Sequence, residues 1–199
     1  MSHSVDLVFP LAGQSLRSDY ALPLWQALRA ALPWLADESD AAILPIKGSS
    51  PSAGQLLLNR RAQLTLRLPP TRVAAAKALA GMRLDLGGAL QLGEAQVREL
   101  RPTAAQYSPL VVFEADDEVQ FLAHCERALD SMAVRANLVC GRTQTVGAEN
   151  GELRGFSLMA HGLALEHALR LQQFGLGRAR KLGCGIFVPH KTAHAVGAA

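Results

Sequence analysis

The chain has 199 residues, of which 49% are hydrophobic and 19% charged, and its formal net charge is +3. This composition excludes an intrinsically disordered protein, and the small positive charge permits a nucleic-acid partner without requiring one. Its three cysteines are far apart and form no C-x-x-C, so we expect reduced thiols in a cytoplasmic protein, with no metal site and no cofactor. No long apolar run and no signal-peptide pattern is present, so we expect no membrane partner.

The first half of the chain alternates strand-like and helix-like segments. Residues 5–11 form an apolar run that predicts a strand, and hydrophobic residues spaced three and four apart predict a helix over residues 20–35. The remaining patterns predict strands at residues 42–47, 64–68, 82–86 and 90–100 and a helix at residues 72–80. We therefore expect the order β-α-β-β-α-β.

The same order returns after Pro102. The patterns predict strands at residues 107–114, 136–140, 153–159 and 186–188, helices at residues 116–132 and 163–174, and a loop at residues 141–151. The first of these helices starts with Asp116, Asp117 and Glu118, where the helix dipole favours negative charge. The sequence thus predicts an α+β protein of two tandem ferredoxin-like, RRM-like units, with domains at residues 1–102 and 103–199.

One stretch between the last helix and the last strand is rich in glycine and positive charge. Residues 175–185 hold four glycines and three cations and no acidic residue: Gly175, Gly177, Gly183 and Gly185, with Arg178, Arg180 and Lys181. The stretch follows a helix and precedes a strand, which does not fit a dinucleotide fingerprint or a P-loop. A solvated surface turn is one interpretation. The other is a loop that offers backbone N–H groups and cations to the phosphates of a polyanion.

Further basic residues can extend this surface. We expect RNA contacts from side chains outside the loop, namely Arg60, Arg61, Arg142, His190 and Lys191. His124 and His167 lie within predicted helices, so we expect them to be packing or surface residues. Aromatic residues make up only 5% of the chain, which favours recognition of a structured RNA hairpin over stacking along an extended single strand.

The glycine spacing G-x-G-x₅-G-x-G after tandem ferredoxin-like halves resembles the RAMP-type CRISPR-associated proteins, and most of all the compact Cas-six group of repeat-cleaving endoribonucleases. The stretches VDLVFPLAG, YALPLWQALRAALPWL, ILPIKG and RLQQFGLGRARKLGCGIFVPHK carry the resemblance over nearly the whole chain. It implies metal-independent cleavage of a CRISPR repeat hairpin through attack of a ribose 2′-OH on the adjacent phosphate. It also implies that the enzyme stays on its product and joins the backbone Cas proteins of an effector complex.

The chain departs from the family pattern at the general base. Many members carry a histidine in or just after the first helix, whereas this chain has none between His3 and His124. Some relatives use lysine and tyrosine instead, which points here to Tyr20 and Lys47, with Ser49 or Ser50 as helper. A packing role for Tyr20 and a solvated cation at Lys47 are the alternatives. Two other functions also stay open, a non-catalytic RNA-binding subunit and a small-molecule binder.

Overall fold

The computed structural model describes residues 4–49 and 54–191. By its contacts the chain divides into two compact units. Unit 1 comprises Met1–Leu100, Val146–Leu153 and Arg180–Gly183, and unit 2 comprises Arg101–Thr145, Arg154–Ala179 and Cys184–Ala199. None of the helices in the described ranges is long and apolar enough to cross a membrane.

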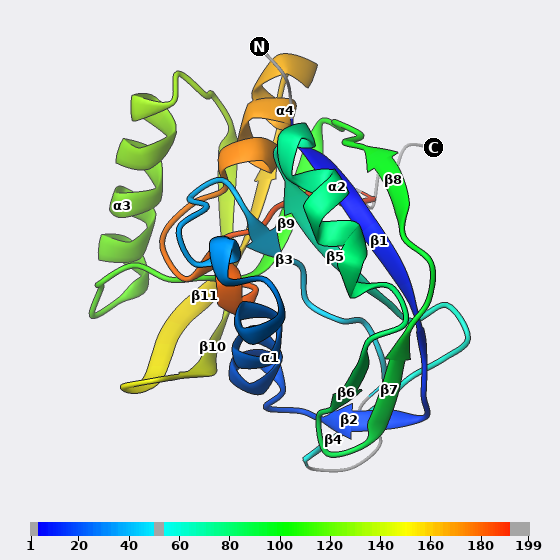
Figure 1. Ribbon diagram of the computed structural model, residues 1–199. Helices are drawn as coiled ribbons and strands as arrows, with labels where there is room; N and C mark the ends of the chain where they lie inside the picture. Colours follow the sequence, from blue (N-terminus) through cyan, green and yellow to red (C-terminus); the bar gives the residue numbers. More distant parts are fainter. Residues whose placement is uncertain (1–3, 50–53, 192–199) are drawn as a thin grey trace, which may run out of the picture. The chain divides into compact units, whose positions relative to one another are not determined.

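Unit 1 contains a ferredoxin-like sheet (Figure 1). Its elements are β1 (Val5–Ala12), β2 (Ser15–Arg17), α1 (Ala21–Ala31), η1 (Pro33–Leu35), β3 (Ala42–Ile43), β4 (Gln55–Leu57), β5 (Gln63–Leu68), η2 (Pro70–Arg72), α2 (Val73–Ala76), η3 (Lys77–Leu79), β6 (Arg83–Asp85), β7 (Ala89–Leu92) and β8 (Gln96–Glu99), where η denotes a short 3₁₀ helix. Antiparallel pairing gives the order β3-β5-β1-β8. The predicted β-α-β-β-α-β unit is therefore present, and β6, β7 and the small β2-β4 ribbon are additions to it.

The core of unit 1 follows from alternation along β1 and β5. Leu7 pairs with Leu66 and Phe9 with Leu64, so these four side chains share one face of the sheet, and all are fully buried. Leu24 and Leu28 of α1 and Ala76 and Leu79 of the α2 region join the same hydrophobic cluster.

Several predicted elements of the first half are wrong in their extent. The helix expected over residues 20–35 ends at Ala31, because Pro33 has no N–H to continue it and starts η1 instead. The strand expected over residues 90–100 is two strands, β7 and β8, which pair with different parts of β1. Pro10 of β1 lies opposite the gap between β7 and β8. Its carbonyl accepts the Gly93 N–H, but proline has no N–H of its own to donate to the partner strand.

Unit 2 repeats the ferredoxin-like order without additions. Its elements are β9 (Ala105–Val111), α3 (Glu118–Ser131), β10 (Asn137–Ala148), β11 (Gly151–His161), α4 (Leu165–Phe174) and β12 (Val188–Pro189). The short helix η4 (Arg180–Leu182), between α4 and β12 in the chain, belongs to unit 1. The sheet order is β10-β11-β9-β12, as in the sheet of unit 1. The tandem ferredoxin-like fold predicted from the sequence is confirmed.

The loop predicted over residues 141–151 is wrong. β10 continues to Ala148 and β11 begins at Gly151, so the segment is a long β-hairpin joined by Glu149 and Asn150. Asn150 is followed by Gly151, and Asn-Gly at a turn is a strong hairpin signal, while the preceding threonines favour strand. The acidic residues predicted at the start of the helix are confirmed at α3, because the Asp117 carboxylate accepts the Gln120 N–H at 2.8 Å.

Candidate functional site

The glycines of the predicted RNA-binding loop are required by the loop's own geometry. Gly175, Gly177 and Gly185 have φ of 68°, 73° and 67°. A Cβ at Gly177 would lie 2.4 Å from the Val112 carbonyl oxygen, and one at Gly185 would lie 1.9 Å from that of Leu176. Only glycine allows the chain to pass so close to Val112 and to its own backbone in this conformation.

Six backbone amides of the loop donate to carbonyls of the protein, among them those of Gly175, Gly183 and Cys184. The Arg178 N–H donates to the Val112 carbonyl at 3.1 Å, and the Gly185 N–H donates to Leu110 at 2.7 Å. The Leu176 N–H closes the loop on the Gly185 carbonyl at 3.0 Å. The expectation that the loop offers its N–H groups to an anion is wrong for these six amides. The Arg178 side chain, in contrast, is exposed.

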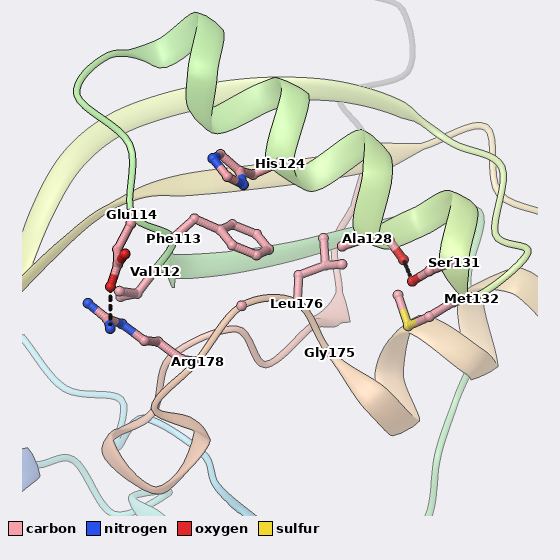
Figure 2. Close-up of a pocket in the computed structure, with 11 residues that line it drawn as sticks. Val112, Phe113, Glu114, His124, Ala128, Ser131, Met132, Gly175, Leu176 and Arg178 are labelled. Carbon is pink, nitrogen blue, oxygen red and sulfur yellow. Dashed lines mark hydrogen bonds and ion pairs between the residues drawn. The ribbon is translucent and has the colours of Figure 1, made fainter.

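The loop's cations differ in their surroundings. Arg178 belongs to unit 2 and is exposed, and its guanidinium lies 3.0 Å from the Glu114 carboxylate (Figure 2). Lys181 belongs to unit 1, where its ammonium donates to the carbonyls of Glu38 at 2.5 Å and Ala41 at 2.9 Å. Arg178 is therefore placed at the surface, whereas Lys181 is bound to the backbone of unit 1.

Burial has shifted the ionisation of both unit 1 cations. It lowers the pKa of Lys181 to about 8, with a further contribution from the charge of Arg180. It also lowers the pKa of Arg180 to about 10, and the neighbouring charge of Arg67 adds to this. Gly183 follows them with φ of 85°, and a Cβ there would lie 3.2 Å from Pro45 Cγ. The second part of the loop is thus built into unit 1.

The other predicted RNA contacts are all exposed. They are Arg60 and Arg61 between β4 and β5, Arg142 on β10, and His190 and Lys191 after β12. The His190 ring lies 5.3 Å from the ring of Tyr107, and its backbone N–H donates to the Ala105 carbonyl at 3.1 Å. These side chains are free to meet a ligand at the surface of the unit to which each belongs.

The structure connects two of the three catalytic candidates. The Tyr20 hydroxyl accepts the backbone N–H of Ile46 at 2.7 Å and donates to the carbonyl of the same residue at 3.4 Å. Burial raises the pKa of Tyr20 to about 12. Lys47 comes next in the chain and is exposed. Tyr20 therefore holds the backbone from which Lys47 projects, and Ser50 lies outside the described residues.

Sequence reasoning missed a cavity of about 420 Å³ in unit 2, shown in Figure 2. Its lining comes from the segment that follows β9, from α3 and the residue after it, and from the start of the glycine loop. Phe113 stacks on His124, with ring centroids 5.6 Å apart and planes at 18°. Local sequence patterns carry no signal for this cavity, because its lining segments are spread along the chain from Val112 to Arg178. In the part of the chain that the structure covers, no cluster of three or more His, Cys, Asp or Glu is placed to hold a metal ion.

Comparisons with known proteins give a consistent family. The family model described as Cas6 Crispr matches residues 5–192. The CRISPR-associated endonuclease Cas6 of Myxococcus xanthus (strain DK1622) is 37% identical over 187 residues, which cover 93% of this chain and 81% of that protein.

Two solved structures share the fold at low sequence identity. A RAMP protein binding different RNA substrates has a TM-score of 0.66 and 12% identity, with 92% of this chain and 98% of that chain covered. The CRISPR endoribonuclease Cse3 bound to 19 nt RNA has a TM-score of 0.53 and 17% identity, with 92% and 97% covered. The family model and the curated relative show that this chain belongs to the Cas6 family of CRISPR-associated proteins.

Proposed function

We propose that this chain is a CRISPR RNA-processing endoribonuclease that binds the repeat hairpin of precursor CRISPR RNA and cleaves it without a metal ion. The observation that carries the proposal is the match to the Cas6 family over residues 5–192, together with 37% identity to a CRISPR-associated endonuclease. The RNA-bound relatives of the same fold support an RNA ligand.

The reaction needs only groups that RNA and protein supply. The ribose 2′-OH loses its proton and attacks the adjacent phosphorus, and the bond from phosphorus to the 5′-oxygen breaks. The leaving 5′-oxygen takes up a proton, so the products are a 2′,3′-cyclic phosphate and a 5′-OH. Each well-placed proton-transfer group contributes roughly 10²–10⁴-fold, and a cation near the pentavalent phosphorane adds electrostatic stabilisation.

Within this reaction we assign Lys47 to the charged phosphorane. Its side chain is exposed and follows directly on the residue that Tyr20 binds. The Tyr20 hydroxyl is engaged with the Ile46 backbone, which supports a positioning role rather than contact with the 2′-OH. Ser50 remains the candidate that assists them from the neighbouring segment.

For RNA binding we propose direct contacts from the exposed basic residues, namely Arg178, Arg60, Arg61, Arg142, His190 and Lys191. Arg180 and Lys181 then serve chiefly to secure the loop, because both are partly buried in unit 1. The glycines Gly175, Gly177, Gly183 and Gly185 give the loop its path.

We further propose that the protein acts in the cytoplasm and stays on the cleaved hairpin as a subunit of an effector complex with other Cas proteins. Residues 1–102 and 103–199 are the two domains of this proposal. The second candidate function is a non-catalytic subunit that holds the CRISPR RNA hairpin, and the lack of any histidine between His3 and His124 favours it.

One assay separates the two functions. Repeat RNA labelled at its 5′ end is incubated with the protein in EDTA, and both cleavage and binding are measured over a range of salt. Cleavage that persists in EDTA and leaves a cyclic phosphate supports the endoribonuclease. Tight binding of intact RNA supports the non-catalytic subunit. Binding that is absent, or that does not weaken as salt rises, contradicts both, because phosphate contacts release counterions.

A further inference from the structure

The cavity of unit 2 has no part in the proposed cleavage reaction (Figure 2). Its volume of about 420 Å³ lies within the range of roughly 300–1,000 Å³ for small-ligand pockets. The lining is mostly apolar, with side chains such as Val112, Leu176 and Met132, and its polar margin carries Glu114 and Arg178. An apolar hollow with a polar margin suits a flat heterocycle that carries hydrogen-bonding groups on one edge.

Two aromatic rings form one wall of the cavity. Phe113 stacks on His124 and meets Phe121 edge-on, with ring centroids 6.2 Å apart, so its orientation is fixed by the core. His124 Nδ1 lies 3.2 Å from a guanidinium nitrogen of Arg127. Because a guanidinium only donates, this Nδ1 accepts and the ring proton is on Nε2. Unstacked bases in RNA complexes pack against such ordered aromatic rings.

The polar margin consists of Glu114 and Arg178, joined by an exposed ion pair at 3.0 Å. Their side chains are 84% and 54% exposed, so the pair is solvated, contributes little to stability and can open at small cost. Together they offer a carboxylate with two acceptor oxygens beside a guanidinium with several N–H donors. Guanine matches this arrangement, because its N1–H and N2 amino group donate next to the acceptor O6. Adenine and cytosine each present one amino group, and uracil presents none.

We propose that this cavity binds one unstacked guanine base of the repeat RNA. Phe113 and His124 pack against the base, Glu114 accepts from N1–H and the N2 amino group, and Arg178 donates to O6. Leu176 and Met132 complete the apolar surroundings. The inference rests on the proposed RNA-binding function and adds base specificity at a position outside the scissile phosphate.

Inosine substitution tests the inference, because inosine is guanosine without the N2 amino group. Each guanosine outside the predicted duplex of the repeat RNA is replaced singly by inosine, and dissociation constants are measured for the full chain. One position should lose about tenfold in affinity, the effect of one hydrogen bond to a charged acceptor. In Glu114→Gln the loss at that position should fall below about twofold.

Glu126→Gln is the matched control, because it removes the same charge from an exposed site of α3 outside the cavity lining and should keep the full inosine effect. Phe113→Leu, which removes the ring while keeping an apolar side chain, should weaken binding of the guanosine RNA. If the protein binds repeat RNA but no inosine effect depends on Glu114, the base pocket is wrong and the proposed function stands. If the protein does not bind repeat RNA at all, the proposed function fails and the pocket fails with it.

Discussion

The hydroxyl of Tyr20 accepts the backbone N–H of Ile46 at 2.7 Å and so ties the start of α1 to the segment that carries Lys47. Ile46 is buried and its N–H has this side chain as acceptor. Loss of the hydroxyl would leave a buried donor without its partner, which costs roughly 1–3 kcal/mol.

Tyr20→Phe should therefore slow cleavage more than it weakens RNA binding. We expect a lower single-turnover rate, an unchanged dissociation constant for repeat RNA and a lower midpoint of thermal unfolding. Tyr107→Phe, at the only other tyrosine, is the matched control. An unchanged cleavage rate in a protein of reduced stability would remove Tyr20 from the mechanism and leave it a purely structural residue.

Lys47→Gln should lower the cleavage rate by about 10² or more, because it removes the positive charge that we propose to stabilise the phosphorane. Binding should change little, since one exposed cation among many contributes a small part of the total. Lys77→Gln, at an exposed lysine of η3, controls for net charge. Normal cleavage by Lys47→Gln would show that the catalytic cation lies elsewhere.

Gly185→Ala should destabilise the protein by about 2 kcal/mol or more. The new Cβ would lie 1.9 Å from the Leu176 carbonyl oxygen, at a backbone φ of 67° that disfavours any other residue. Gly147→Ala is the control, because a Cβ at this position meets nothing within 4 Å. Urea unfolding followed by circular dichroism measures both, and equal midpoints for the two variants would contradict the steric argument.

Buried thiols should make the protein less stable in alkali. Burial raises the pKa of Cys125 and that of Cys184 to about 12, against an ordinary value of 9.0. Since the pKa is raised in the folded protein, each thiol's contribution to the free energy of unfolding is complete below about pH 9. This contribution is lost as the pH rises toward 12. Over this range the free energy of unfolding falls by about 1.4 kcal/mol per pH unit for each thiol.

Lys181 acts in the opposite direction, because burial lowers its pKa in the folded protein to about 8 from 10.5. The cost of burying its positive charge is removed as the pH rises between these values, so its effect is to raise the free energy of unfolding. Comparison of Cys125→Ala with the parent protein between pH 8 and 11 cancels this contribution. The variant should lose less stability per pH unit above pH 9. Parallel curves for the two proteins would show that Cys125 does not keep its proton.

Local patterns in the sequence determined the order of elements in both halves and the place of the glycine loop after α4. They did so because alternation and three- or four-residue spacing record which face of a strand or helix is buried. The same patterns failed where neighbours along the chain do not decide the structure. The segment 141–151 is a hairpin and residues 90–100 form two strands, since pairing partners and Pro10 of a distant strand set those limits.

Alternation and residue spacing were enough to predict the tandem ferredoxin-like fold, and the residues themselves carried the Cas6 resemblance and the basic side chains that can meet RNA. The partners of these residues became visible only in the folded chain. The Gly185 amide donates to Leu110 of β9 and the Arg178 amide to Val112 just after it, Lys181 binds carbonyls more than 100 residues away, and Phe113, His124 and Arg178 line one cavity. Such contacts join segments far apart in the chain, and a linear pattern of burial carries no record of which distant backbone group or side chain will be the partner.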